Sequence, residues 1–396
     1  MSKRLGVRDI GEYNRKRILR ILREIPDISR AELVKETSLA APSISRIVAE
    51  LIDAGLIQEV GIGTSKGGRK PICLRINPNA RYVIGVDIKP DKVMFVRSNL
   101  YSIILDRIEI PLKIKSNQSD AVKYIIDELG NFIESTGIDM SNLVGIGIAV
   151  PGLIDSLNGV VRYSSHLDWK NVQLRKLINE KIDVSVYLEN TTTAAMIAER
   201  WEGHGKNLKN FIYLYIGEGI GAAYILNDQI YRGSYYSSIE LGHTIICPKG
   251  DLCSCGKYGC WEAMASSRAL RKSYLRYKKQ QNQEIRDFSA DFDEQDQMVQ
   301  AILLDEKDGV KAIRECMDYL VIGLVNVVNT FIPERIVING WPRYLRANQK
   351  LEILNEVKEK AMNGLEDIID IEYSEQAKDG PIKGATMTAL NDFFSV

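Results

Sequence analysis

Three short stretches near the start of the chain predict helices, and the first and third have hydrophobic residues at helical spacing. The first stretch predicts an amphipathic helix, because its apolar residues fall on one face: Ile18, Ile21, Leu22 and Ile25. Ser29-Arg30-Ala31-Glu32 has the pattern of a capping box and predicts the start of a second helix. Pro42 suits the first turn of a third helix, and Gly55 is placed to end it. The buried stripe of this third helix is Ile44, Ile47, Val48, Leu51 and Ile52.

The pattern after the third helix predicts two strands, 56–60 and 70–76, around a glycine-rich tip. Such a unit is a winged helix-turn-helix, in which the N-terminal part of the second of the paired helices contacts base edges. An Arg–Lys pair beside glycines can enter a narrow minor groove. We therefore predict a DNA-binding domain over residues 1–78, whose DNA contacts are Ser43, Ser45, Arg46, Arg69 and Lys70. A three-helix bundle used only for dimerisation is the alternative.

Strands alternate with helices from Tyr82 onward, which predicts a twisted mixed sheet covered by helices. The strands are expected at 82–88, 93–98, 103–110, 144–150, 335–340 and 368–373. The helices are expected at 118–135, 261–279 and 310–331, with a last helix opening near Asp379. Residues 280–297 are polar and acidic, which is typical of a solvated loop or helix. The fold class predicted for this part is α/β.

The composition is that of an ordinary globular protein with two or three domains. Of 396 residues, 45% are hydrophobic and 26% are charged. Lys+Arg and Asp+Glu both number 52, so no overall positive charge points to nucleic acid. Residues 1–24 are nevertheless basic, which is a local electrostatic footprint for DNA. Because no apolar run could span a membrane and no signal peptide opens the chain, we expect a cytoplasmic protein with no membrane partner.

One histidine and three cysteines lie within eighteen residues, in a loop that also contains glycines: His243, Cys253, Cys255 and Cys260. Zinc prefers four nitrogen and sulfur ligands of this kind, and a closed set of four indicates a structural site. Disulfides are the main rival, but three clustered cysteines cannot pair evenly. Unligated cysteines are the other alternative. We predict a structural Zn²⁺ in a loop over 243–260, with Glu240 and Glu262 at its edges.

The run Glu-x-Gly-His followed by Cys-x-Cys-Gly-x-x-Gly-Cys-x-Glu resembles the signature of the ROK family of sugar kinases and sugar-responsive repressors. The resemblance covers nearly the whole chain. It implies a two-lobed, actin-like (ribonuclease-H-like) ROK domain over residues 79–396. It also implies that the sugar ligands are Asn190, Glu240, His243 and Glu262. Charged carboxylates suit this role, since they accept strong, directional hydrogen bonds from sugar hydroxyls.

Three positions depart from the pattern of ROK kinases. Lys89-Pro90 stands where a kinase has a glycine-rich phosphate loop, and proline removes an amide donor. Glu218 adds a negative charge to a second phosphate loop. Thr191 follows Asn190 where the kinases have an aspartate as general base, and threonine cannot accept that proton near neutral pH. These departures predict that the protein is not an enzyme.

Within the family, the chain most closely resembles the xylose repressors. The similar motifs are the Gly-Gly-Arg-Lys-Pro ending of the wing, Pro151-Gly152-Leu153-Ile154-Asp155, Trp169, Tyr231-Arg232-Gly233 and the Cys-Ser-Cys-Gly run. This resemblance implies a repressor of carbohydrate-utilisation genes that binds operator double-stranded DNA and is released by a monosaccharide, with xylose favoured. A homodimer or a dimer of dimers is expected on a palindromic operator.

Two alternatives stay open. The first is a repressor that responds to another ligand: glucose, a disaccharide, an oligosaccharide or a protein partner of a sugar transporter. Ile239 and His166 keep it open, because both depart from the residues common in the family, as does the bulky run 235–238. The second alternative is an active sugar kinase with a DNA-binding appendage, against which Thr191 speaks.

Overall fold

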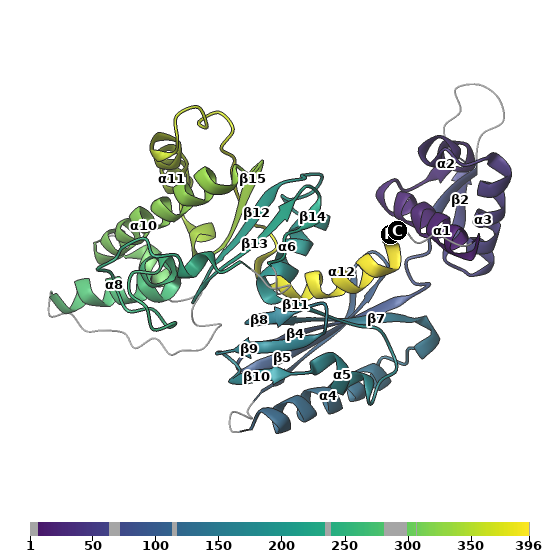
Figure 1. The fold of residues 1–396 in the computed structure, drawn as a ribbon, viewed down its shortest axis with the longest axis horizontal. Coiled ribbons are helices and arrows are strands. Elements are labelled where there is room, and N and C mark those ends of the chain that lie inside the picture. The colour runs from purple at the N-terminus through teal and green to yellow at the C-terminus, as the bar shows by residue number, and fades with distance from the viewer. Residues whose placement is uncertain are drawn as a thin grey trace. The chain divides into compact units, whose positions relative to one another are not determined.

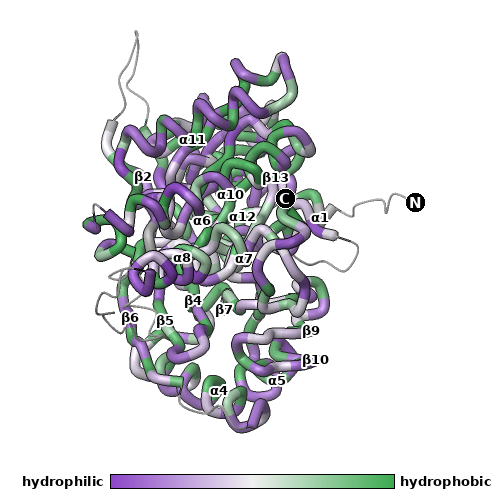
Figure 2. The backbone as a smooth tube through the Cα atoms, turned by 90° about the vertical axis from the view of Figure 1, so that its left-hand side faces the viewer, coloured by the Kyte–Doolittle hydropathy of each residue, from purple (hydrophilic) through white to green (hydrophobic). Residues whose placement is uncertain are grey.

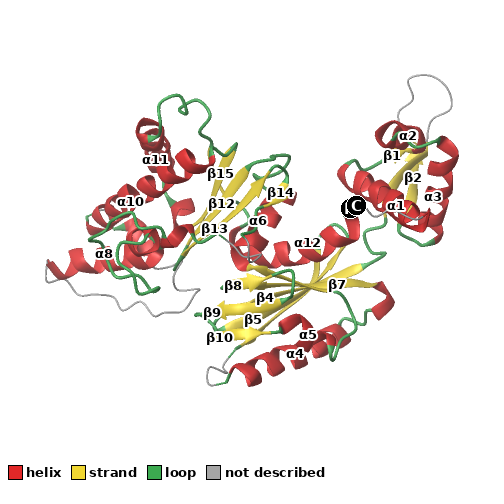
Figure 3. Cartoon of the chain, in the orientation of Figure 1, coloured by secondary structure: helices red, strands yellow, loops and turns green. Residues whose placement is uncertain are grey.

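The computed structural model describes residues 7–62, 72–112, 117–233, 239–280, 299–305 and 307–395. The chain divides into two compact units, Met1–Glu189 with Ile382–Val396, and Asn190–Pro381. Helices and strands alternate along both units (Figures 1 and 3). No helix in the described part of the chain is long and apolar enough to cross a membrane.

The first unit opens with a winged helix-turn-helix. It contains α1 (Val7–Glu24), β1 (Ile28–Ser29), α2 (Arg30–Thr37), α3 (Ala41–Asp53), β2 (Ile57–Ile62) and β3 (Ile72–Ile76). The strands form an antiparallel sheet in the order β1-β3-β2. The predicted capping box is confirmed, because the Ser29 hydroxyl accepts from the Glu32 amide and the Glu32 carboxylate accepts from the Ser29 amide. The wing tip, including Arg69 and Lys70, lies outside the described residues.

A five-stranded sheet follows in the same unit, in the order β11-β7-β4-β5-β6. Its strands are β4 (Tyr82–Ile88), β5 (Lys92–Asn99), β6 (Ile104–Pro111), β7 (Leu143–Val150) and β11 (Val186–Asn190). β4 and β7 are parallel, whereas β4, β5 and β6 pair antiparallel. The apolar face of α4 (Gln118–Ser135) belongs to the hydrophobic cluster of this sheet. A smaller sheet of β8 (Leu153–Asp155), β9 (Val160–Ser164) and β10 (Trp169–Val172) precedes α5 (Leu174–Asn179).

The last helix, α12 (Gly380–Phe394), approaches the five-stranded sheet very closely. A Cβ atom at Gly147 would lie 1.8 Å from the Ala385 carbonyl oxygen, and one at Gly85 would lie 2.5 Å from the Thr386 methyl group. Only glycine fits both places, since each has helix atoms where a side chain would begin. These two strand glycines therefore set how closely α12 packs.

The second unit contains its own five-stranded sheet, in the order β14-β13-β12-β15-β16. The strands are β12 (Phe211–Ile216), β13 (Ile220–Leu226), β14 (Gln229–Ile230), β15 (Arg335–Gly340) and β16 (Ile371–Tyr373). β12, β15 and β16 are parallel, and β12, β13 and β14 are antiparallel. The helices are α6 (Thr191–Glu202), α7 (Trp261–Ala265), α8 (Ser267–Gln280), α10 (Asp308–Phe331) and α11 (Ala347–Lys360). Hydrophilic and hydrophobic positions alternate along α11 (Figure 2), and its buried residues are Ile353 and Val357.

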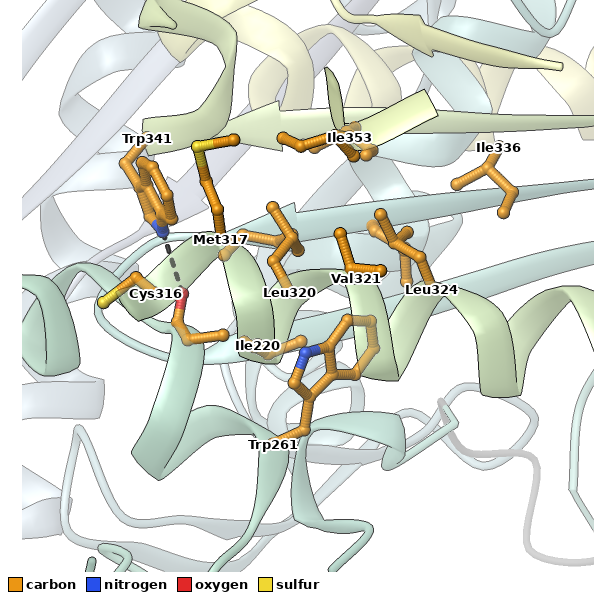
Figure 4. Packing of buried hydrophobic residues seen from close by; sticks show 14 of the residues in the cluster. Ile220, Trp261, Cys316, Met317, Leu320, Val321, Leu324, Ile336, Trp341 and Ile353 are labelled. Atoms are coloured by element: carbon orange, nitrogen blue, oxygen red, sulfur yellow. Dashed lines mark hydrogen bonds between the residues drawn. The ribbon is translucent and has the colours of Figure 1, made fainter. Parts of the chain in front are cut away.

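The core of the second unit is built around α10 and two tryptophans (Figure 4). A Cβ atom at Gly323, in the middle of α10, would lie 1.9 Å from the Trp261 ring. Trp261 therefore packs directly on the backbone of α10, in the space that any other residue at 323 would fill. Trp341 is also buried, and its indole N–H donates to the Ala265 carbonyl at 2.9 Å. Both tryptophans thus hold the short helix α7 in place.

Two predicted elements differ in the structure. The single helix expected over 261–279 is two helices, because Ser266 has an extended backbone (φ −72°, ψ 169°) and its hydroxyl accepts from the Ala269 amide. A serine at a helix start does this readily, but its place inside an apolar pattern concealed it. The strand expected over 368–373 is only Ile371–Tyr373. The polar segment after Gln280 lies outside the described residues.

Replacing Gly323 with alanine is expected to destabilise the protein by about 1–3 kcal/mol, because the new methyl group overlaps the Trp261 ring. Urea unfolding of full-length protein measures this change. The matched control is Gly130→Ala in α4, where a Cβ atom has no neighbour within 4 Å. That control is expected to stabilise by about 0.5–1 kcal/mol. Equal behaviour of the two variants would contradict the packing described for Trp261.

Candidate functional site

The histidine and three cysteines singled out in the sequence come together in one cluster. The ligand atoms of His243, Cys253, Cys255 and Cys260 all lie within 4.8 Å of one another. The His243 Nδ1 atom is 3.6 Å from the Cys253 sulfur, and the Cys255 and Cys260 sulfurs are 3.7 Å apart. One nitrogen and three sulfur atoms at this spacing could hold a metal ion.

The loop that carries the cluster is shaped by tight turns and glycines. The Cys253 amide donates to the Lys257 carbonyl, and the Gly256 amide donates to the Cys253 carbonyl, which wraps the chain around one side of the cluster. Gly259 has a φ of +72°, and a Cβ atom there would lie 1.6 Å from the Cys247 carbonyl oxygen. Glycine at 259 is therefore required by both the backbone angle and the close approach.

The electrostatics of the cluster favour a bound cation. Burial and the neighbouring sulfurs of Cys255 and Cys253 raise the pKa of the Cys260 thiol to about 12. Burial also raises the pKa of the Cys253 thiol, whereas the Lys257 backbone amide lowers that of Cys255. Three sulfurs this close cannot all become thiolates without a positive charge between them. A divalent ion supplies that charge, so the donor set fits a metal.

Two carboxylates border the cluster, as the sequence predicted. One oxygen of Glu262 accepts from the Ser254 hydroxyl at 2.8 Å, and the other accepts from the Ile220 amide at 3.1 Å. A Glu240 oxygen lies 4.0 Å from the His243 Nε2 atom. The structure therefore places Glu240 beside His243, and Glu262 beside Cys253, at the border of the cluster.

Asn190 lies at the N-terminus of α6, where its side-chain oxygen caps the helix by accepting from the Thr192 amide at 2.8 Å. A Cβ atom at Gly221 would lie 2.3 Å from the Thr192 hydroxyl oxygen, so this helix end packs on β13. β13 also begins with Ile220, whose amide binds Glu262. Asn190 and Glu262 are thus placed at the same end of β13 by a helix cap and a backbone hydrogen bond.

The turn between β12 and β13 is bonded to the start of α8. The Ser267 hydroxyl donates to Glu218 at 3.2 Å, and the Arg268 guanidinium lies 3.5 Å from the other Glu218 oxygen. The Ser267 amide also donates to the Gly217 carbonyl at 2.7 Å. The sequence marked Glu218 but missed Ser267 and Arg268, since nothing in the sequence links residues about fifty positions apart. Ser254 was missed too, although its place between two cysteines was a signal.

A second ion pair lies at the end of β4 in the first unit. The Lys89 ammonium is 3.6 Å from a carboxylate oxygen of Asp87, which is fully buried. The partly buried lysine neutralises an acid that is otherwise costly to bury. This pairing is local, because the two residues are two positions apart on one strand end.

The residues of α3 that were predicted to contact DNA differ in exposure. Ser45 and Arg46 are exposed, whereas Ser43 is half-buried. The Arg46 guanidinium donates to Glu50 at 2.8 Å, and Arg15 of α1 binds the other Glu50 oxygen. The hydrogen bond from Arg15 lowers the pKa of Glu50, and the two arginines compensate its charge. Arg46 is thus oriented along the exposed side of α3.

Comparisons with known proteins agree with this geometry. The ROK family model matches residues 83–391, and a winged helix-turn-helix DNA-binding model matches residues 12–58. The xylose repressor of Bacillus spizizenii is 33% identical over 395 residues, covering 98% of this chain and 97% of that protein. The xylose repressor of Caldicellulosiruptor bescii is 31% identical, with 87% of each chain covered. The regulator NagC of Escherichia coli is 26% identical over 84% of this chain and 81% of its own length.

Solved structures extend the likeness to the fold. A ROK family transcriptional regulator, described as a homologue of the E. coli MLC protein, matches with a TM-score of 0.84 and 26% identity. The match covers 97% of this chain and 98% of the regulator. The ROK family glucokinase of Streptomyces griseus, in complex with glucose and AMPPNP, matches with a TM-score of 0.64 and 22% identity over 78% of this chain and 98% of its own. This second likeness shows the fold alone.

Fold and site together define a winged helix-turn-helix protein whose α/β body has the actin-like fold of sugar kinases. The chain belongs to the ROK family. The predicted fold class and family resemblance are therefore confirmed.

Replacing Cys255 with serine is expected to lower metal affinity more than about a hundredfold, because the loss of a supporting contact alone commonly costs 10–100-fold. Elemental analysis and competition with a chelator measure the content and affinity of the ion. Cys247→Ser is the matched control, since Cys247 lies in the same loop but outside the cluster. Loss of metal in the control, or its full retention in Cys255→Ser, would contradict the assignment of the ligands.

Proposed function

We propose that the protein is a sugar-responsive transcriptional repressor of carbohydrate-utilisation genes, with xylose as the favoured effector. Its winged helix binds operator double-stranded DNA, and sugar binding in the ROK domain releases the DNA. One observation carries the proposal: a DNA-binding winged helix and a carboxylate-bordered His–Cys site occur in one chain that is 33% identical to a xylose repressor over 98% of its length.

Zinc is the proposed metal, held by His243, Cys253, Cys255 and Cys260. Bond lengths of about 2.0–2.3 Å in a tetrahedron place a nitrogen and a sulfur roughly 3.6 Å apart and two sulfurs roughly 3.8 Å apart. The observed spacings of 3.6 Å and 3.7 Å support this geometry. Four protein ligands leave no open position, so the ion would act as a structural clamp for the loop.

The proposed sugar ligands are Asn190, Glu240, His243 and Glu262. If His243 binds zinc through Nδ1, its Nε2 atom keeps a proton and faces Glu240 at 4.0 Å. The site then presents one N–H donor between carboxylates that accept hydrogen bonds. Vicinal sugar hydroxyls both donate and accept, so they match this alternation.

Two ion pairs and one missing base argue against an active sugar kinase. Lys89 is paired with Asp87, and Glu218 is paired with Arg268 and Ser267, at the two places where ROK kinases bind phosphates. Thr191 begins α6 directly after Asn190, where a kinase needs a carboxylate to accept the proton of the sugar hydroxyl. These features support a binding protein that no longer transfers phosphate.

DNA release requires that the sugar bind the DNA-competent and DNA-incompetent states with different affinity. A homodimer, or a dimer of dimers, on a palindromic operator would provide two winged helices with a defined spacing. In each chain we assign residues 1–78 to the DNA-binding domain and 79–396 to the sugar-binding domain. The proposed DNA contacts are Ser43, Ser45, Arg46, Arg69 and Lys70. The xylose repressors that this chain resembles are bacterial, and bacterial operators lie in the cytoplasm, so we place the protein there.

A different sugar, such as glucose or an oligosaccharide, is the second candidate effector. Ile239 supports this candidate. It pairs with Ala222 of β13 and directly precedes Glu240, and the family usually has glycine at position 239. A residue bulkier than glycine at position 239 changes the space through which a sugar would reach the Glu240 carboxylate.

The first test is operator release. Full-length protein is expected to bind a duplex selected from a random pool, and xylose is expected to release it. Glu240→Gln is expected to keep operator affinity but to lower the response to xylose at least about tenfold, because it removes a charge that accepts sugar hydroxyls. Glu359→Gln, an exposed glutamate on α11, is the control. Unchanged operator affinity across the full range of xylose would overturn the choice of xylose.

The second test is phosphoryl transfer. ADP release in the presence of xylose or glucose is expected to stay at background for the wild type and for Thr191→Asp. Restoring the base alone does not remove the Lys89 and Glu218 ion pairs from the proposed phosphate loops. Sugar-dependent ADP release by the wild type would establish a kinase instead.

A further inference from the structure

Glu262 is held from two sides by the protein. The Ser254 hydroxyl donates to one carboxylate oxygen at 2.8 Å, and the Ile220 amide donates to the other at 3.1 Å. The Cys253 sulfur is a third neighbour, 3.6 Å from the oxygen that Ser254 contacts. A carboxylate oxygen accepts two hydrogen bonds, so the oxygen bound by the Ile220 amide keeps room for a further donor.

Metal binding removes one of these three donors. Cysteine binds zinc as a thiolate, which has no proton to donate. With the ion in place, Ser254 and Ile220 are the hydrogen-bond donors to Glu262 that remain among the described residues. The Ile220 amide is fixed by its strand, whereas the other oxygen depends on one serine hydroxyl.

The backbone that carries the Ser254 hydroxyl is held on both sides. Ser254 lies between two cluster residues, Cys253 and Cys255, so a bound ion holds the backbone on both sides of it. Glu262 is held in the same way, since it follows Cys260 and the buried Trp261. Serine has a single side-chain torsion before its oxygen, so little freedom is left to lose when the hydrogen bond forms.

Without the Ser254 hydroxyl, the Glu262 side chain can move into a neighbouring cavity. A cavity of about 50 Å³ is lined by Glu262 and Ser254 together with Asp251, Arg268 and Lys272. Lys272 is paired with Asp251 and Arg268 with Glu218, so the cavity offers an unrestrained carboxylate room to move rather than a free counter-charge. The hydrogen bond from Ser254 opposes that movement.

We propose that Ser254 is a positioning residue, whose hydroxyl holds the Glu262 carboxylate in the orientation that accepts sugar hydroxyls. The inference rests on the proposed sugar site. A bound metal would order the backbone on both sides of Ser254, and the Ser254 hydroxyl would in turn order the Glu262 carboxylate. The Ser254 side chain itself does not bind the metal. A pre-oriented acceptor binds its ligand more tightly because less side-chain freedom is lost on binding.

The experiment is calorimetric titration of full-length, zinc-loaded protein with xylose and with glucose. The sugar that binds the wild type is then the probe. Ser254→Ala is expected to weaken binding about threefold to tenfold, the range for the net contribution of one ordinary hydrogen bond. Ser254→Thr, which keeps the hydroxyl, is expected to restore affinity. Lys257→Ala, an exposed change in the same loop, is the matched control and is expected to bind as the wild type does.

Two further readouts separate positioning from general damage. Ser254→Ala is expected to keep one zinc per chain and the melting temperature of the sugar-free protein. The variant is also expected to discriminate less between the probe sugar and its epimers, because a mobile carboxylate can accept hydrogen bonds from hydroxyls in more than one orientation.

Wild-type affinity and selectivity in Ser254→Ala would overturn the inference and leave the sugar site standing. Loss of zinc in that variant would also overturn it, since the role would then be structural. Absence of binding by the wild type to either sugar would remove the proposed site itself, and the inference with it.

Discussion

The arrangement of the second unit depends on the packing of Trp261 against the backbone of α10. The absence of a side chain at Gly323 lets the indole ring lie where a methyl group would clash. Trp261 is flanked by Cys260 of the His–Cys cluster and by Glu262 of the proposed sugar site. A single buried ring therefore anchors both functional neighbours to the hydrophobic core. The proposed site is thus held by this anchor on one side and by the turns of the 243–260 loop on the other.

Under the proposed function, a kinase fold becomes a sensor by few local changes. The proposed site keeps the groups expected to recognise a sugar, because recognition needs carboxylates, an imidazole and an amide at fixed places. Phosphate binding needs exposed amides and an absence of negative charge. The carboxylates of the ion pairs Lys89–Asp87 and Glu218–Arg268 lie at the two proposed phosphate loops and outside the proposed sugar site. Under the proposed function, sugar recognition and phosphoryl transfer are therefore separable.

Local patterns predicted much of the fold. The capping box at Ser29, the proline in the first turn of α3 and the long apolar face of α10 all appear where expected. Each depends on residues within one or two turns of each other, so its physics is contained in a short sequence. The break at Ser266 was missed for the opposite reason. The buried tryptophans around α7 fix its end through contacts with α10 and with Trp341, which no local pattern reveals.

The sequence by itself determined the family, the winged helix and the set of four N/S donors, since these are written in residue type and spacing. Only the tertiary structure decided which partners complete the site. Ser254 on Glu262, Arg268 on Glu218 and Trp261 on Gly323 are contacts across 8, 50 and 62 positions. The packing of loops and helices determines which of these distant residues meet, because a side chain forms a hydrogen bond with a group that the fold brings within about 3 Å. Residue type determined which groups could form a contact, and the fold determined which partner each group meets.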